Sequence, residues 1–370
     1  MRFVQYSIFF IPAKSCYGYF VSIVSDCLQK AMIKQLTIHR IYVIMGAMMQ
    51  TKLLGQIIKS LIDKEGKKMH VSTSAQESVP KASKRFKHPL LGGIVWTILG
   101  YALSNLLGLV VALFLGIISV AVGMNDADSD AFATTYSAFA IAIGALLVLY
   151  CFHSRYKKDG LHNFITSGNI ALAALLIIPG ILYSLSSLLN ASIAPTLQSI
   201  AISAQAGITE EIVFRALPIA FMMRAYKFDE KKIPVAVLIS SAVFGLFHFS
   251  NLLVGAPPIA TTLQVLNAFA IGVFFGAVYA RTGNILFCLL NHTLHDIFAL
   301  MDEAAVEQNG LMKEMELNIA VVFAFVVWAV LIAIGLYDIR KAKRGEISTR
   351  WRKIWSYTEP AENAEVSAEI

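Results

Sequence analysis

The chain has 370 residues, of which 57% are hydrophobic and only 15% are charged, and its mean hydropathy is +0.65. A soluble domain carries about 25% charged residues, so this composition excludes an ordinary soluble protein. The net charge of +7 falls between apolar segments and therefore does not indicate a nucleic-acid partner. The composition predicts a helical protein that crosses the membrane several times.

Residues 1–68 differ from the rest of the chain. Their apolar stretches are too short to span a membrane, because prolines and charged residues such as Pro12 and Lys34 interrupt them. Lys64-Glu-Gly, shortly before Met69, can be encoded by codons that resemble a bacterial ribosome-binding site. We therefore predict a bacterial protein whose translation starts at Met69, which makes residues 1–68 a doubtful extension. The alternative is a genuine N-terminal extension.

A basic segment, residues 69–88, precedes eight apolar segments that predict an all-α bundle of about eight transmembrane helices over residues 89–337. These segments lie at 89–123, 132–152, 168–189, 199–223, 233–253, 258–280, 284–301 and 317–337. A basic tail, residues 338–370, follows the last of them. We expect its tryptophans either to lie along an anionic leaflet or to flank the last span at the membrane interface.

Basic residues are concentrated in every second loop. They occur before the first span, after the second, after the fourth, after the sixth and between Arg340 and Lys353, whereas the intervening loops contain Lys313 as their basic residue. Positive charge marks the cytoplasmic side of membrane proteins. The basic N-terminal segment and the C-terminus are therefore both predicted to be cytoplasmic, and residues 89–123 are predicted to cross the membrane once.

Two glutamates and an arginine lie within the fourth apolar segment. Ionisable groups at bilayer depth are costly, and they are usually functional. Glu211 and Arg215 are four residues apart on one helix face, so we expect them to form an ion pair. Glu210 is rotated by about 100° from Glu211 and is the predicted general base. The alternative is that both glutamates serve helix packing.

The fifth segment contains His248, with Phe244 four residues before it on the same helix face. A lone histidine on an apolar helix is more often a hydrogen-bonded core residue than a ligand. Here its depth in the membrane and the complementary groups on other helices favour a functional role.

The seventh segment contains His292 and Asp296, four residues apart. This spacing places both side chains on one helix face, where they are suited to metal ligation or to holding a water molecule. His295 is three residues from His292, and we expect it to pair instead with Asp302 near the outer surface. The predicted depths of these groups allow one common site.

Three motifs carry a resemblance to a known family. They are Glu210-Glu211-Ile-Val-Phe-Arg215, Phe244-Gly-Leu-Phe-His248 and His292-Thr-Leu-His-Asp296. Their order, each in its own membrane segment, resembles the CPBP family of intramembrane proteases, which groups the type II CAAX prenyl endopeptidases with bacterial bacteriocin-processing and immunity-type proteins. The resemblance implies hydrolysis of a peptide bond within the membrane.

The resemblance also implies a role for each motif residue. Glu210 would activate the water, His248 would help to hold it, and His292 and Asp296 would orient it or stabilise the oxyanion. Glu211, Arg215 and Phe244 would support the site. Asp296 stands where many relatives have asparagine, and an ionised aspartate is a poor oxyanion donor. Two alternatives stay open: a zinc or other divalent metal held by Glu210, His248, His292 and Asp296, or a metal-free glutamate protease.

The predicted partners are the lipid bilayer and a membrane-associated peptide or protein substrate. Because the chain is predicted to be bacterial, a bacteriocin or pheromone precursor is favoured over a prenylated protein. Two other functions use the same residues. One is a non-catalytic membrane regulator or immunity protein on the same scaffold. The other is a proton-coupled transporter, which the absence of visible inverted repeats disfavours.

Overall fold

The computed structural model describes residues 86–162, 169–188, 191–301 and 319–357. The chain divides into two units, one formed by residues 12–87 and the other by residues 1–11 and 88–370. Almost all described residues belong to the second unit, to which the following account refers. The predictions for residues 1–68, for Met69, for most of the basic segment 69–88 and for the end of the tail lie outside the described residues.

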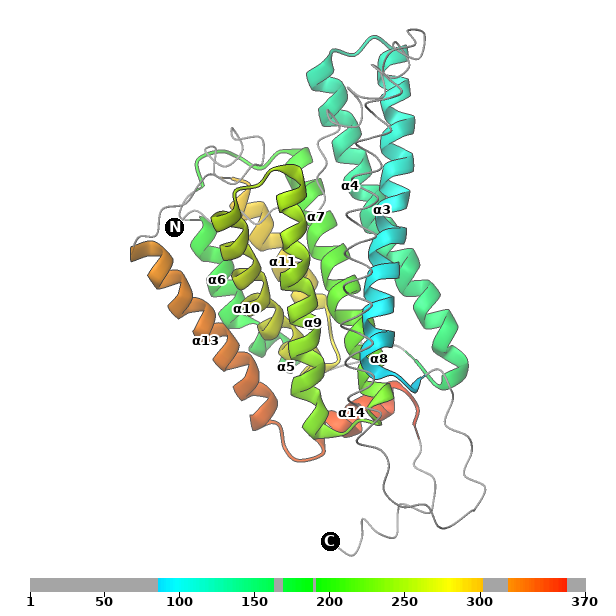
Figure 1. Cartoon of the computed structure of the whole chain (residues 1–370), viewed down its shortest axis with the longest axis vertical. Helices are drawn as coiled ribbons and strands as arrows, with labels where there is room; N and C mark the ends of the chain where they lie inside the picture. Colours follow the sequence, from blue (N-terminus) through cyan, green and yellow to red (C-terminus); the bar gives the residue numbers. More distant parts are fainter. Residues whose placement is uncertain (1–85, 163–168, 189–190, 302–318, 358–370) are drawn as a thin grey trace, which may run out of the picture. The chain divides into compact units, whose positions relative to one another are not determined.

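Two long helices, α3 (Pro89–Ala121) and α4 (Asp126–Tyr156), pack side by side (Figure 1). Residues 89–121 form one continuous helix, as predicted. Helix α4 begins earlier than the apolar pattern indicated, because the Asn125 side chain accepts a hydrogen bond from the backbone N–H of Asp128 and so caps a polar first turn.

The third predicted span is broken into α5 (Ile170–Leu176) and α6 (Ile178–Leu188), which meet at an angle of 47°. The break falls at Ile177, two residues before Pro179, which has no backbone N–H to donate and whose ring clashes with the carbonyl four residues earlier. A kink at this point is therefore expected from the sequence.

The fourth predicted span also changes its helix type along its length. It consists of α7 (Leu197–Glu211), a single π-helical turn η3 (Ile212–Ala216) and α8 (Leu217–Ala225). Pro218 cannot donate to the carbonyl of Phe214, and this carbonyl accepts the hydroxyl of Ser240 instead. The π turn therefore occurs where the regular hydrogen-bond ladder is interrupted, and such turns are frequent at functional sites.

The remaining elements are η4 (Glu230–Lys232), α9 (Ile233–Phe247), η5 (His248–Val254), α10 (Pro258–Thr282), α11 (Leu286–Ala299), α13 (Ile319–Lys341) and α14 (Glu346–Ile354). A short 3-10 turn, η2 (Lys157–Asp159), ends α4. The described residues form helices and no strand, so the chain is an all-α polytopic membrane protein, as predicted.

Within the described residues, five helices are long and apolar enough to cross a membrane, or six if α5 and α6 form one bent span. The other two predicted spans are helical but do not meet this criterion. One is divided among α7, η3 and α8 and carries three charged residues, and the other, α11, has only 14 residues. The total of eight spans therefore stays a prediction.

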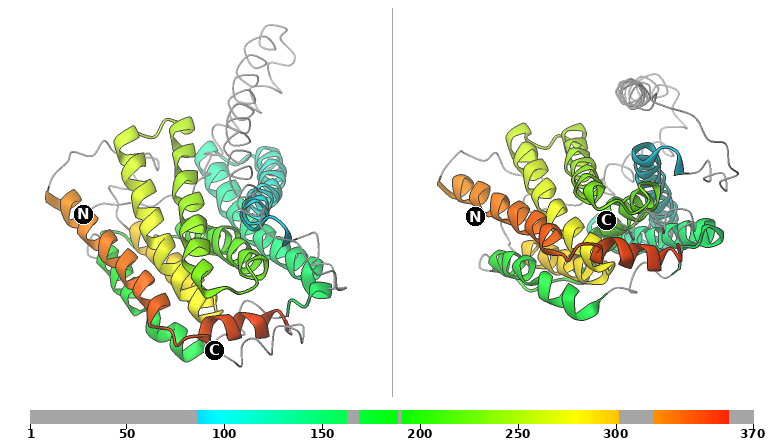
Figure 2. Two further views of the ribbon diagram at one scale, coloured as in Figure 1. Left: turned by 60° about the horizontal axis from the view of Figure 1, so that its bottom comes forward. Right: turned by 90° about the horizontal axis from the view of Figure 1, so that it is seen from below.

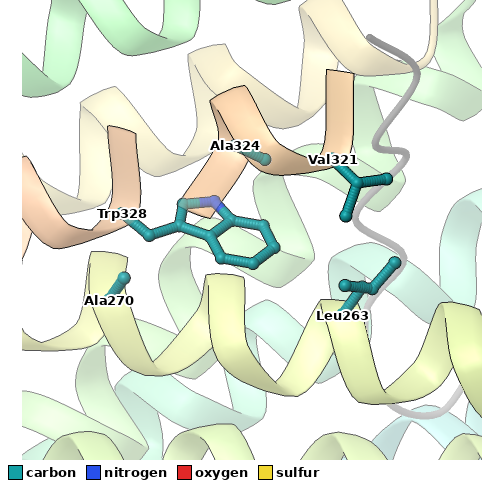
Figure 3. Close-up of a cluster of buried hydrophobic side chains, with 5 residues drawn as sticks. All are labelled: Leu263, Ala270, Val321, Ala324 and Trp328. Atoms are coloured by element: carbon teal, nitrogen blue, oxygen red, sulfur yellow. The ribbon is translucent and has the colours of Figure 1, made fainter. Parts of the chain in front are cut away.

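Helix α10 is the central helix of the bundle. It packs against α9 and α13, and 89% of its most apolar 18-residue stretch is buried. Part of its contact with α13 is an apolar cluster, shown in Figure 3, which consists of Leu263, Ala270, Val321, Ala324 and Trp328. This packing places one face of α10 toward α13 and another toward the helices that carry the three motifs.

The C-terminal helix α14 lies across one end of the bundle (Figure 2). Its apolar side chains are buried against the protein: the Trp351 indole N–H donates to the carbonyl of Ala280 at 2.7 Å, and Trp355 is fully buried. These tryptophans therefore pack against the protein, and the placement of the tail along the leaflet or at the membrane interface stays a prediction. The sequence alone does not show that α14 folds back onto α10.

Candidate active site

The structure brings the three motifs together inside the bundle. Glu210 and Glu211 occupy the last turn of α7, and Arg215 lies in the π turn that follows. His248 lies where α9 passes into η5, and α11 carries both His292 and Asp296. All six side chains are buried, with exposed fractions of 3% or less. The motif residues are therefore all interior, as a common site requires, and the contacts that follow join the first motif to the third.

Glu211 binds two partners. Its Oε1 atom lies 3.0 Å from Nη1 of Arg215, which confirms the predicted ion pair, and 2.8 Å from Nδ1 of His292. Because a carboxylate can only accept, His292 donates through Nδ1 and its Nε2 atom is directed elsewhere. Glu211 therefore links the first motif to the third and fixes the orientation of the His292 ring, a role that the sequence did not reveal.

Phe244 supports the site in two ways. Its ring lies beneath the Arg215 guanidinium at 3.7 Å, a cation–π contact in a buried position. Its backbone carbonyl accepts a hydrogen bond from Nδ1 of His248 at 3.0 Å. A carbonyl has no proton to give, so Nδ1 of His248 carries the proton and Nε2 has a free lone pair. Within the described residues, Nε2 of His248 is buried without a hydrogen-bond partner.

His292 Nε2 faces two carboxylates. Glu210 Oε2 lies 3.6 Å away and Asp296 Oδ2 lies 3.7 Å away. Both distances exceed those of a direct hydrogen bond, so the imidazole and the two carboxylates are in close electrostatic contact. His248 lies within electrostatic range of His292 and Arg215. The arrangement thus gathers two carboxylates and two imidazoles in one buried region.

Tyr101 is a further residue at this site, contributed by α3. It lies within electrostatic range of Glu210 and hydrogen-bonds the Asn105 side chain. Its ring packs against Phe247, at 4.7 Å between centroids, and against Phe214, at 6.0 Å. Sequence analysis missed Tyr101 because α3 reads as uniformly apolar, and its approach to Glu210 depends on how α3 packs against α7 and α9.

His295 lies on α11 within electrostatic range of His292, but its ring is turned toward another helix. Its ring stacks on that of Tyr183, with 5.0 Å between centroids and 20° between planes, and its Nδ1 lies 3.5 Å from the hydroxyl of Ser187. It therefore faces α6, as its exclusion from the catalytic set implied. Its predicted partner, Asp302, lies outside the described residues.

The donor types of the site suit a divalent metal, but their arrangement does not. Two histidines and two carboxylates are the ligands that zinc takes in catalytic sites. Within the described ranges, however, no group of three or more His, Cys, Asp or Glu side chains converges as a metal site requires. We therefore derive no catalytic step through a metal.

The fold and the site together define a class: a helical membrane protein with an internal acid–base site. Its glutamates, histidines, aspartate and arginine come from three helical segments and are buried. Comparison with protein families sharpens this class. The family model described as "Type II CAAX prenyl endopeptidase Rce1-like" matches residues 192–298, which include all three motifs. This match supports the family resemblance that the three motifs carry.

The family described is a protease family, so the match supports a CAAX-type intramembrane protease in general. Neither the curated proteins nor the solved structures give a match to the chain.

Proposed function

We propose that the protein is an endopeptidase that hydrolyses a peptide bond of a membrane-associated peptide or protein, using a water molecule activated by Glu210. The observation that carries the proposal is the position of His292. Its Nδ1 is fixed by Glu211 at 2.8 Å, while its Nε2 lies 3.6 Å from Glu210. This geometry supports a water molecule between a carboxylate base and an oriented imidazole.

In the proposed reaction, Glu210 removes a proton from the water, and the resulting hydroxide adds to the carbon of the scissile carbonyl. The lone pair on Nε2 of His248 accepts a hydrogen bond from the second O–H group of the water, which stays on the oxygen, and so helps to direct the attack. Glu210 then passes its proton to the nitrogen of the leaving amine as the C–N bond breaks. Water, base and leaving group are thereby balanced without another reactant.

The developing oxyanion needs a hydrogen-bond donor in this buried region. His292 supplies one when Nε2 is protonated, and the neighbouring carboxylate of Asp296, 3.7 Å from Nε2, favours that protonation. Asp296 thus serves through His292 rather than as a direct donor. This role suits an aspartate where many relatives have asparagine.

Glu211, Arg215 and Phe244 hold these groups in place. The Arg215 charge is compensated by Glu211 and by the face of the Phe244 ring. An unpaired charge at this depth would be strongly destabilising. In the proposed mechanism the three residues contact neither the water nor the substrate, so they position the catalytic groups.

A bacterial peptide precursor, such as a bacteriocin or pheromone precursor, is the substrate we propose. Lys64-Glu-Gly before Met69 can be encoded by codons that resemble a bacterial ribosome-binding site, which supports a bacterial chain. The basic loops support cytoplasmic placement of the N-terminal segment and the C-terminus. A prenylated protein is the alternative substrate that the family description names.

The test replaces Glu210 by glutamine, which keeps the size of the side chain and removes the base. Membranes that contain the wild-type protein or the Glu210→Gln variant are compared by quantitative proteomics for peptides with new termini. We expect the cleaved products to disappear in the variant. Glu230→Gln is the matched control, because Glu230 lies in η4, where it accepts from the backbone N–H of Gly345, and a glutamine oxygen can accept the same bond.

The same comparison decides between the functions that the sequence left open. Products that persist in Glu210→Gln membranes contradict the proposed mechanism. A biological effect that persists without cleavage would indicate a non-catalytic regulator or immunity protein. Ion flux through the purified protein in lipid vesicles, lost in the same variant, would indicate a transporter.

A further inference from the structure

The seam between α3 and α9 is closed by two aromatic side chains. The two helices lie side by side (Figure 1), and the Tyr101 ring of α3 packs edge-on against the Phe247 ring of α9, with 4.7 Å between centroids. Both residues are partly exposed, and Tyr101 lies within electrostatic range of Glu210. The side chains that close the seam therefore reach from the surface of the bundle toward the proposed catalytic centre.

A row of rings leads from the seam to the second motif. The Phe247 ring packs on Phe214 of the π turn, and Phe214 packs on Phe244, with 5.2 Å between centroids in both pairs. The Phe244 ring lies edge-on to His248 at 4.8 Å. Phe214, Phe244 and His248 are fully buried. Phe247 is therefore the outermost ring of a row that ends at a proposed catalytic residue.

By contrast, α7 packs on α11 and α9 packs on α10 through their backbones. A Cβ atom at Gly207 of α7 would lie 2.7 Å from the backbone nitrogen of Thr293 in α11. One at Gly245 of α9 would lie 2.9 Å from the carbonyl oxygen of Val265 in α10. Within the described residues, no glycine makes such a contact between α3 and α9. Rotation of a side chain can open this seam, whereas the other two contacts open only if whole helices move apart.

The exposed side chains beside the seam are apolar. Ile98, about one turn before Tyr101, is 48% exposed, and Leu246, next to Phe247, is 59% exposed. Neither α3 nor α9 contains a charged residue. A charged or strongly hydrated segment would lose its water at this seam without compensation, whereas an apolar segment would not.

We propose that the α3–α9 seam is the entry for the substrate, and that an apolar peptide segment dissolved in the bilayer passes between the two helices when the Phe247 ring rotates away from Tyr101. The inference rests on the proposed proteolytic function and adds to it a route and a chemical class of substrate. Tyr101 is held by a hydrogen bond with the Asn105 side chain. Phe247 ends α9, where the chain passes into the 3-10 turn η5, and it is the ring that we expect to move.

The first test measures access to Glu210 and does not depend on proteolysis. The protein in lipid vesicles at mildly acidic pH is treated with dicyclohexylcarbodiimide, a lipid-soluble reagent that modifies protonated carboxyl groups, and the labelled residues are identified by mass spectrometry. We expect labelling of Glu210 to be about tenfold faster in Phe247→Ala, since the loss of one aromatic pair changes the equilibrium between closed and open seam by about that factor. Phe247→Trp, whose larger ring covers more of the seam, should slow it. Glu211, which is fully buried and paired with Arg215, should stay unlabelled in each protein.

Phe249→Ala is the matched control. Phe249 is 37% exposed and lies two residues after Phe247, which places it on the opposite side of the helix. We expect Glu210 in this variant to be labelled as fast as in the wild type. If Phe247→Ala does not fold, Phe247→Leu removes the ring but keeps an apolar side chain, with Phe249→Leu as its control. A water-soluble carbodiimide should label Glu210 more slowly than the lipid-soluble reagent.

The second test repeats the proteomic comparison of membranes with Phe247→Trp and, as its control, Phe249→Trp. We expect the cleaved products to fall severalfold in Phe247→Trp alone. Equal labelling of Glu210 in Phe247→Ala and Phe249→Ala, or faster labelling by the water-soluble reagent, would overturn the seam as the entry. Failure of the proposed function looks different: wild-type membranes would then contain no cleaved products, while the labelling of Glu210 would still follow the size of the side chain at position 247.

Discussion

Helices α3 and α10 are both apolar enough to span a membrane, yet they occupy opposite environments. Over its most apolar 18 residues, α3 has a mean hydropathy of 2.4, and only 22% of these residues are buried. The corresponding stretch of α10 has a lower mean hydropathy of 1.7, yet 89% of it is buried. In a soluble protein the more hydrophobic helix would be the more buried one. Here the exposed surface faces lipid, so the polar residues belong in the interior.

The two regions also use their polar side chains differently. In α3, the hydroxyls of Thr97 and Ser104 donate to carbonyls of their own helix four residues earlier. Around α10, polar side chains bond between elements: Tyr183 to Asn267, and Asn251 to Gln264. The α3–α4 wall has bonds between its helices near its two ends, between Trp96 and Tyr156 and between Ser119 and Ser129, and close packing holds the stretch between them. The core that surrounds the proposed site is held by directional bonds between helices.

Removing the central carboxylate should produce the largest effect on the core. In Glu211→Gln, Arg215 would remain buried without a full counter-charge, and His292 would lose an anionic acceptor. We expect the free energy of unfolding to fall by about 3–5 kcal/mol, measured as thermal unfolding in detergent, together with loss of cleavage. The double variant Glu211→Gln/Arg215→Met removes both charges and should recover part of this stability. No recovery would contradict a charge-based role for the pair.

A substitution in the contact between α3 and α4 should lower the stability of the protein more than its cleavage rate. The α3–α4 contact is close at Gly144, where a Cβ atom would lie 2.9 Å from both Cα and the carbonyl oxygen of Ser104. Gly144→Val should force the two helices apart and lower the free energy of unfolding by about 1–3 kcal/mol. Leu147→Val, at a 54% exposed position of the same helix, is the control and should have little effect. Equal unfolding temperatures for the two variants would refute close packing as the basis of the wall.

Tyr101 tests the boundary between the two regions, because it is the residue that α3 contributes beside Glu210. Tyr101→Phe keeps the ring contacts with Phe247 and Phe214 and removes the hydroxyl. If that hydroxyl helps to position Glu210, the loss of about 1 kcal/mol typical of one hydrogen bond lowers the rate about fivefold. Stability should be unchanged. Tyr136→Phe, at a 46% exposed position of α4, is the control, and an equal loss in both variants would remove Tyr101 from the site.

Much of the candidate site followed from helix periodicity. The spacing of four residues placed Glu211 beside Arg215 and put His292 and Asp296 on one face, and the structure shows both arrangements. The bond from Glu211 to His292 and the approach of Tyr101 did not follow. They depend on how helices distant in the sequence rotate against one another, which a pattern within one helix does not encode.

The fold shows the same division between local and tertiary information. Hydropathy located the long spans, and Pro179 marked the bend between α5 and α6. The π turn before Pro218 is stabilised by Ser240 of another helix, which accounts for its absence from the predicted elements. The burial of Trp351 beneath α10 likewise depends on a contact between residues 71 positions apart.

The smallest expected effect concerns metal ions. Nε2 of His292 lies near two carboxylates, but within the described parts of the chain no three ligand side chains converge. A mechanism that uses Glu210 alone as the base therefore predicts that purified protein keeps its cleavage rate after treatment with a strong chelator. Adding zinc afterwards should not raise that rate. Loss of activity on chelation, restored by zinc but not by magnesium, would contradict this prediction. It would show that the site binds a metal ion and that this ion, rather than Glu210 alone, activates the water.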